Sequence, residues 1–360
     1  MKIITDPVKL AKKLVSISSE SGNEKEVAEF IFKYLKTLGL AVQKQKIEKN
    51  RFNVVVIGEG EILLNSHIDT VPIGEKKDWS VNPYGQIKNG RLYGRGSCDT
   101  KGNGACILAA LAKNPTKKIS CSFTVGEENT FAGIKEVMKM RRTKLKHIKY
   151  CLNFEPTELR LVTAHKGQQY LMIKAKGKAA HASTPEEGEN AIQKLNHSIN
   201  KLQKYIKTFI KKKHKLLGNP TLNIGVIKGG IGYNVIPDSA EIEIDIRTLP
   251  NQDSSKIIKQ IKKVVAPSKV EVRHTHNPVD LPSKTPFIKL LQDILKNEGL
   301  KHQSRGVNYT TEFSEIYKYR IRGAVLGAGS VKQAHIIDEY VSVKDLKKLH
   351  KMLCALLELA

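Results

Sequence analysis

Short apolar runs with the length of β-strands recur along this chain, and several of them lead into a carboxylate or imidazole side chain. The polar residues at these run ends are His67, Glu127, Glu128 and Glu155. Segments with helical spacing of apolar residues alternate with the runs, which predicts an α/β sheet covered by helices on both faces. Because such sheets usually place their sites at strand ends, these residues are candidate functional residues.

The first part of the chain supplies most of this alternation. The expected helices cover residues 5–20, 23–38, 103–113 and 133–140, and the expected strands cover 53–57, 62–64, 121–125 and 150–154. Ser21 and Glu24 have the spacing of a capping box at the start of the second helix, and Gly39 is its expected stop.

The pattern changes after Gly167, where a second unit is expected. Its expected strands cover residues 168–175, 222–227, 240–246 and 270–274, and its expected helices cover 190–211 and 254–265. The order β-α-β-β-α-β is that of a ferredoxin-like unit. Because the α/β pattern resumes near Leu281, the sequence predicts a domain of residues 1–166 and 278–360 that carries an inserted domain of residues 167–277.

Composition limits the function classes. The net charge of +26 permits a nucleic-acid partner, but no aromatic residues interleave with the densest basic cluster, Lys211 to Lys215, so a solvated basic surface is favoured over nucleic-acid binding. The five cysteines lack the spacing of a disulfide scaffold or a zinc ribbon. With no run long enough for a membrane helix and no signal-peptide core, the expected location is the cytoplasm, without a membrane partner.

The polar residues at the strand ends have the chemistry of metal ligands. Carboxylates and imidazoles in this mixture suit a pair of divalent ions such as zinc, which would make the chain a two-metal hydrolase. Asp69 follows His67 by two residues and so can reach toward its imidazole. Asp99 and His335 each lie in a glycine-rich segment, where either side chain can be a ligand, and Cys98 beside Asp99 is interpreted as a packed neutral thiol.

Each signal has an ordinary structural alternative. His67 with Asp69 can be a surface pair, Asp99 a turn former, and Glu127 with Glu128 a solvated pair. Beside metals, however, adjacent glutamates can divide into a ligand and a general acid/base. Serine hydrolases and phosphate-binding loops are disfavoured, because neither a Gly-x-Ser-x-Gly elbow nor a phosphate-binding glycine loop is present.

Several segments, taken in order, resemble one known family. They are residues 66–72 (SHIDTVP), 93–102 (YGRGSCDTKG), 127–128 (EE), 155–157 (EPT) and 329–335 (GSVKQAH). Together they are similar to the dinuclear zinc aminoacylases and metallopeptidases. The resemblance implies a zinc-peptidase-like catalytic domain with a mixed sheet flanked by helices, and an inserted ferredoxin-like lid and dimerisation domain.

The resemblance also implies roles for individual residues. Asp99 would bridge two zinc or cobalt ions, with the remaining ligands His67, Glu155, Glu128 and His335. Asp69 would orient His67, and Glu127 would be the general base and acid. Three residues of the inserted domain complete the site: His181, reaching across a homodimer to the carbonyl oxygen, and Arg247 and Asn234, holding the substrate carboxylate.

Finer details select a substrate class within the family. Segments such as 245–250 (DIRTLP) resemble the acetylornithine deacetylases, which implies removal of the acyl group from a small N-acyl amino acid in arginine biosynthesis. Gly126 stands where the family commonly has an aspartate. The alternatives left open are a succinyl-diaminopimelate desuccinylase, a dipeptidase or carboxypeptidase, and a non-catalytic protein that binds RNA through its basic surface.

Overall fold

The computed structural model describes residues 2–359, which divide into two compact units. Unit 1 runs to Thr163 and also contains Leu281–Arg305 and the described residues from Thr311 onward, whereas unit 2 contains Ala164–Asp280 and Gly306–Thr310. The sequence predicts boundaries at 166/167 and 277/278 and assigns 306–310 to the larger domain. That short segment instead belongs to unit 2, where the hydroxyl of Thr310 donates to the carbonyl of Lys166 at 2.9 Å.

A mixed sheet in the order β1-β2-β6-β3-β7-β17-β8 forms the framework of unit 1. Its strands are β1 (Val42–Glu48), β2 (Arg51–Val56), β3 (Ile62–His67), β6 (Ile119–Thr124), β7 (Tyr150–Asn153), β8 (Val162–His165) and β17 (Arg322–Val325). The neighbours β6, β3, β7 and β17 run parallel, so their carboxyl ends meet at one edge of the sheet. The residues that follow these four strands are therefore brought close together.

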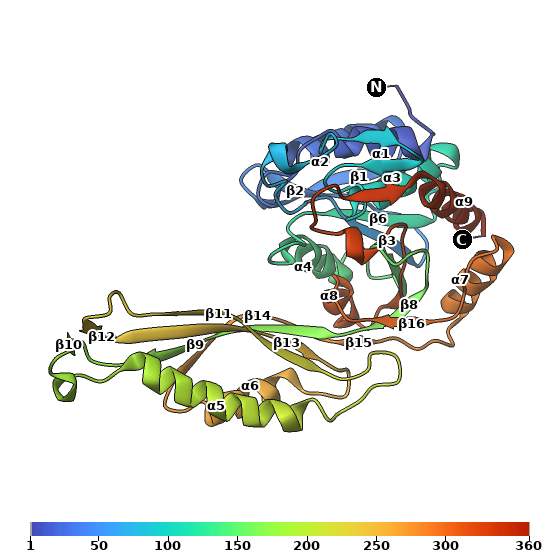
Figure 1. The fold of residues 1–360 in the computed structure, drawn as a ribbon. Coiled ribbons are helices and arrows are strands. Elements are labelled where there is room, and N and C mark those ends of the chain that lie inside the picture. The colour runs from blue at the N-terminus through green and yellow to red at the C-terminus, as the bar shows by residue number, and fades with distance from the viewer. Residues whose placement is uncertain (1, 360) are drawn as a thin grey trace. The chain divides into compact units, whose positions relative to one another are not determined.

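Helices flank this sheet. They are α1 (Pro7–Val15), α2 (Lys25–Thr37), α3 (Lys101–Lys113), α4 (Ala132–Lys139), α7 (Pro286–Asn297), α8 (Phe313–Tyr317) and α9 (Val343–Leu359). Helix α3 packs against α1, α9 and β3, and α4 packs against β1, β2 and β6. Figure 1 shows β3 and β6 between α3 and α4. Because α3 is rich in alanine and glycine and is buried over nearly its whole length, it can lie close to the sheet.

A smaller sheet of unit 1 joins two distant segments. It consists of β4 (Gln86–Lys88), β5 (Arg91–Tyr93) and β18 (Tyr340–Ser342), in the order β18-β5-β4. The pairing of β18 with β5 holds the segment after His335 beside the segment before Asp99.

The start of α2 differs from the predicted capping box. Its N-cap residue, Glu24, makes no cap hydrogen bond, and its buried carboxylate instead accepts from Arg51 Nη2 at 2.7 Å and from the N–H of Gly22 at 2.9 Å. The hydroxyl of Ser21 donates to Asp69. The capping-box prediction is wrong because tertiary partners take both side chains. The predicted stop is confirmed, since Gly39 has a φ of 73° after the helix ends.

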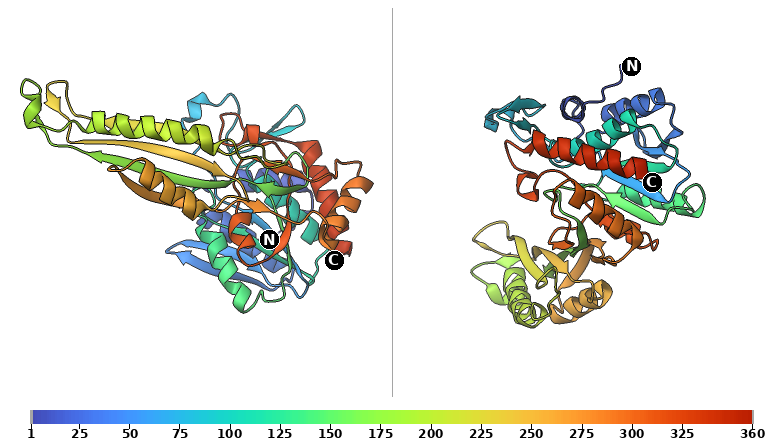
Figure 2. Two further views of the ribbon diagram at one scale, coloured as in Figure 1. Left: turned by 90° about the horizontal axis from the view of Figure 1, so that it is seen from below. Right: turned by 90° about the vertical axis from the view of Figure 1, so that its right-hand side faces the viewer.

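Unit 2 contains a four-stranded antiparallel sheet in the order β11-β13-β9-β14. Its elements are β9 (Gly167–Lys176), α5 (Ala191–Phe209), β11 (Thr221–Gly229), β13 (Ser239–Thr248), α6 (Ser254–Val264) and β14 (Lys269–His276). Figures 1 and 2 show α5 and α6 side by side on one face of this sheet. The predicted order of strands and helices is therefore present, and the alternation of β13 places its apolar side chains under the helices.

Four further short strands are present. Strands β10 (Ala180–His181) and β12 (Val235–Ile236) form a ribbon in unit 2, which also contains β15 (Val279–Asp280), and β16 covers Arg305–Val307. Among residues 2–359, no helix combines the length and the apolar composition that a membrane span requires.

Candidate metal centre

Neighbouring parallel strands of unit 1 end side by side, and each is followed by a candidate ligand. Strand β3 ends at His67, which is level with Thr124 at the end of β6. Glu127 and Glu128 follow Thr124 closely, and Glu155 follows the end of β7. The sheet therefore brings together residues that lie far apart in the sequence.

Asp99 lies between two groups of potential ligands. Its Oδ1 is 3.0 Å from His67 Nε2, which is itself 4.0 Å from Glu155 Oε2. Its Oδ2 is 3.5 Å from His335 Nε2, which is 2.9 Å from Glu128 Oε2. Within each group the three ligand atoms lie within 4.8 Å of one another. The two oxygens of one carboxylate thus face two separate sets of donors.

The donor set fits a pair of divalent ions. Donors about 2.0–2.2 Å from a tetrahedral zinc lie about 3–4 Å from one another, close to the separations seen here. The Nδ1–H of His67 donates to the carbonyl of Asp69 at 3.0 Å, which leaves Nε2 as the free ligand nitrogen. Glu128 Oε1 is buried and has no hydrogen-bond partner among the described residues, as expected of an oxygen placed to ligate a cation.

The electrostatics of the cluster also favour a cation. Within the described chain, no lysine or arginine forms an ion pair with Asp99, Glu127, Glu128 or Glu155. Burial raises the pKa of Glu127, Glu128 and Glu155 above the ordinary glutamate value. Hydrogen bonds to Asp99 and Glu128 raise the pKa of His335 to about 10. A bound cation would therefore offset the cost of burying these carboxylates.

Asp69 supports the loop that carries the two glutamates. Its Oδ1 accepts the backbone N–H of Glu127 at 3.0 Å, and its Oδ2 accepts the N–H of Glu128 at 3.1 Å and the hydroxyl of Ser21 at 2.6 Å. The sequence predicts that the Asp69 carboxylate orients His67. That carboxylate lies 3.6 Å from His67 Nδ1, and the closer acceptor is the Asp69 backbone carbonyl.

Cys98, next to Asp99, is fully buried. Burial raises the pKa of its thiol well above the ordinary value, with Glu339 and Asp99 adding to the effect. The Sγ atom donates to the carbonyl of Ser330 at 3.4 Å. The prediction of a packed neutral thiol is confirmed, because nothing here stabilises a thiolate.

A buried polar network under the centre was missed by the sequence analysis. Asn65 Nδ2 donates to Asn153 Oδ1 and to Glu312 Oε2, both at 2.6 Å, and Thr124 donates to the same Glu312 oxygen at 2.8 Å. Burial raises the pKa of Glu312 to about 7. The available signal was the presence of asparagines within two apolar strands, since buried polar side chains require partners.

The three predicted residues of unit 2 do not form one cluster. His181 and Asn234 are exposed and lie close together, because β10 pairs with β12 and the N–H of Ala182 donates to the carbonyl of Asn234 at 3.0 Å. Arg247 lies near the other end of β13, where its Nε donates to Asp245 at 2.7 Å. At about 3.3 Å per residue, Ser239 and Arg247 are roughly 26 Å apart along that strand.

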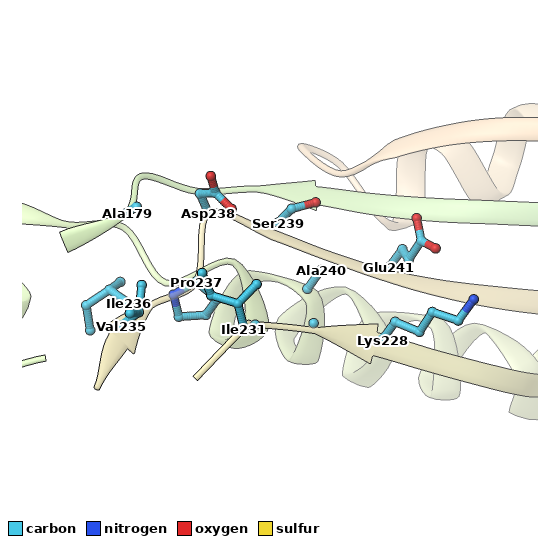
Figure 3. A pocket seen from close by; sticks show the side chains of 12 residues that line it. Ala179, Lys228, Ile231, Val235, Ile236, Pro237, Asp238, Ser239, Ala240 and Glu241 are labelled. Atoms are coloured by element: carbon cyan, nitrogen blue, oxygen red, sulfur yellow. The ribbon is translucent and has the colours of Figure 1, made fainter. Parts of the chain in front are cut away.

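A separate cavity of about 260 Å³ lies beside the β10–β12 ribbon. Figure 3 shows Ile231, Val235, Ile236 and Pro237 on its lining. None of the candidate metal ligands lines this cavity, so its shape carries no information on the metal centre.

Known proteins are similar to this chain in sequence and in fold. The sequence profile of peptidase family M20/M25/M40 matches residues 63–359. The acetylornithine deacetylase of Vibrio atlanticus (strain LGP32) is 32% identical over an alignment of 345 residues, with coverage of 90% of this chain and 88% of that protein. An M20 family metallo-carboxypeptidase from Sulfolobus solfataricus has a similar fold, with a TM-score of 0.82, 19% identity, and coverage of 98% of this chain and 99% of that one. A dinuclear metal-binding peptidase from Bacillus subtilis matches with a TM-score of 0.70, 16% identity, and coverage of 99% and 97%.

Proposed function

Because this chain belongs to peptidase family M20/M25/M40, we propose that it is a metal-dependent amide hydrolase that converts N-acetylornithine to ornithine and acetate. The family and the relatives named acetylornithine deacetylase support a hydrolase acting on an N-acyl amino acid. The observation that carries the proposal is the Asp99 carboxylate, whose two oxygens face two separate ligand groups.

Five residues would hold two divalent ions, zinc or cobalt. They are Asp99 between both ions, His67 and Glu155 on one side, and Glu128 and His335 on the other. When bound, such a pair supplies Lewis acidity, which polarises an amide carbonyl and makes water more acidic. The proposal predicts two bound ions per chain. Elemental analysis measures their number and tells zinc from cobalt.

Glu127 is the general base and acid in this proposal. It is partly buried, and burial raises its pKa above that of an ordinary glutamate, which favours a part in proton transfer. It takes a proton from the attacking water and delivers it to the departing amine. The Asp69 carboxylate accepts the backbone N–H of Glu127 and thereby keeps the Glu127 carboxylate at the candidate metal centre.

The substrate carboxylate is the proposed partner of Arg247 and Asn234, and His181 stabilises the carbonyl oxygen during attack. Because Arg247 and Asn234 lie near opposite ends of β13, one chain cannot offer both to the same small carboxylate. The proposal therefore requires a homodimer in which Arg247 comes from one chain and Asn234, with its neighbour His181, comes from the partner.

A substrate panel tests the proposed function. The zinc-loaded protein is incubated with N-acetylornithine, succinyl-diaminopimelate and a set of dipeptides, and the released acid or amine is measured. Release of acetate from N-acetylornithine without release of succinate supports the proposal. Succinate release or dipeptide cleavage at a higher kcat/KM would instead support one of the alternatives, and no hydrolysis of any of these amides would exclude the proposed activity.

A further inference from the structure

A fully buried carboxylate, Glu339, binds the backbone of the shared ligand segment. Its Oε1 accepts the N–H of Cys98 at 2.8 Å and the N–H of Asp99 at 3.1 Å. These two hydrogen bonds fix the main chain at Asp99, the residue that belongs to both groups of candidate ligands.

The second oxygen of Glu339 forms a buried ion pair with Arg95. Arg95 Nη1 lies 2.8 Å from Glu339 Oε2, and both side chains are nearly inaccessible to solvent. The same Nη1 donates to the carbonyl of Ile336 at 3.2 Å, immediately after His335. The guanidinium also lies over the ring of Trp79, with 5.4 Å between its central carbon and the ring centroid. The ion pair therefore reaches the segment that carries His335.

The backbone of Glu339 reinforces this connection. Its carbonyl accepts the N–H of Gly94 at 2.9 Å, and the next residue, Tyr340, pairs with Tyr93 in the sheet of β18 and β5. The loop after His335 is thus joined to the loop before Asp99 through both main chain and side chain. A shift of Glu339 would displace ligand residues on both loops at once.

We infer that Glu339 is a positioning residue of the metal centre, which holds Asp99 directly and the His335 segment through Arg95. The inference rests on the proposed function, because it concerns the same ligands. Both oxygens of Glu339 are engaged by these contacts, and Glu339 belongs to neither group of candidate ligands. It acts by fixing two ligand segments relative to each other, as residues behind metal ligands commonly do.

Glu24 offers a matched control. Its carboxylate is also fully buried, is paired with an arginine, Arg51, and accepts a backbone N–H, that of Gly22. None of these three residues is a candidate ligand. Glu24→Gln and Glu339→Gln thus each remove a buried ion pair with an arginine from unit 1. Only Glu339 also binds the backbone of Asp99.

The experiment measures metal affinity by competition with a chelator, using zinc and, for its absorption spectrum, cobalt. The full-length wild type and the folded variants Glu339→Gln, Glu339→Ala and Glu24→Gln are compared. We expect zinc affinity to fall about 10- to 100-fold in Glu339→Gln and further in Glu339→Ala, since glutamine keeps one acceptor oxygen. The cobalt spectrum should change in the Glu339 variants, and Glu24→Gln should match the wild type in both readouts.

Trp79 is the only tryptophan of the chain, so its fluorescence reports whether Arg95 has been released. Changed Trp79 emission with wild-type zinc affinity in Glu339→Gln would overturn the inference, and so would an equal loss of affinity in Glu24→Gln. If Glu339→Ala does not fold, the zinc affinity of Glu339→Gln alone tests the inference. Wild-type protein that binds no metal would instead contradict the proposed function, so the two failures are distinguishable.

Discussion

The carboxylate of Asp69 accepts the backbone N–H of Glu127 at 3.0 Å, which links the end of β3 to the loop after β6. Together with the contact to Glu128, this bond sets the position of the loop from which Glu127 reaches the metal centre. The Asp69 carboxylate, which the sequence predicts to orient His67, therefore also holds the backbone of Glu127, the proposed base, and of Glu128, a proposed ligand.

Replacing the proposed base should separate chemistry from metal binding. We expect Glu127→Gln to keep both metals and to lose about 10²- to 10⁴-fold in kcat, because the amide cannot accept the proton of water. Metal content and turnover of N-acetylornithine are measured on the same sample. Glu136→Gln, a change at a half-buried position of α4 where the side chain pairs with Lys139, is the control. Near-normal turnover in Glu127→Gln would remove this residue from the mechanism.

Asp99 should matter for both metals at once. An amide offers one good ligand oxygen where the carboxylate offers two, so Asp99→Asn is expected to reduce bound zinc from two ions per chain to one or none. Elemental analysis after dialysis provides the count. Asp6→Asn is a suitable control, because Asp6 caps α1 and asparagine is an equally good cap. Two tightly held ions in Asp99→Asn would show that the carboxylate is not shared.

Arg247 should affect substrate binding more than chemistry. Loss of a charged hydrogen bond to the substrate carboxylate is worth about 1.5–3 kcal/mol, which corresponds to a fall of about 10- to 100-fold in kcat/KM. In Arg247→Ala we expect this fall to appear mainly as a raised KM. Arg273→Ala is the control in the same unit, since Arg273 is paired with Glu271 on β14. Equal effects of the two substitutions would contradict the assignment.

His165 should make the stability of unit 2 depend on pH. Burial lowers its pKa to about 4, below the ordinary 6.5, so the folded state stays unprotonated while the unfolded state takes up a proton. The free energy of unfolding should therefore fall as the pH decreases from 6.5 to 4, and this residue contributes about 3 kcal/mol of that fall.

Denaturant unfolding at pH 7 and pH 4.5 checks this dependence. Between pH 7 and pH 4.5, the free energy of unfolding should fall less in His165→Gln than in the wild type. His197→Gln, at an exposed position of α5, should behave like the wild type. An identical loss in His165→Gln and the wild type would mean that His165 does not titrate differently in the two states.

The sequence was informative where apolar strands run directly into polar residues. His67 and Glu155 could be found in this way, because β3 and β7 are buried runs whose ends are abrupt. The inserted unit was also predictable, since the alternation of β13 is strict. His335 gives a weaker local signal, because it follows a glycine-rich turn rather than the end of a buried strand, and the family resemblance supplied its role.

Other features depend on partners that are distant in the sequence. Strand β1 was not predicted because its lysine- and glutamine-rich alternation has few apolar residues, and it forms through pairing with β2. Ser21 and Glu24 have the spacing of a capping box, but Asp69 and Arg51 compete for them. No role could be assigned to Glu339 from the sequence, because that role depends on contacts with Asp99 and Arg95.

Anomalous diffraction from crystals of the zinc-loaded protein tests the central claim most directly. The account predicts two anomalous peaks per chain on opposite sides of the Asp99 carboxylate, one within bonding distance of His67 and Glu155 and the other within bonding distance of Glu128 and His335. A single peak, or two peaks that do not share Asp99, would contradict it.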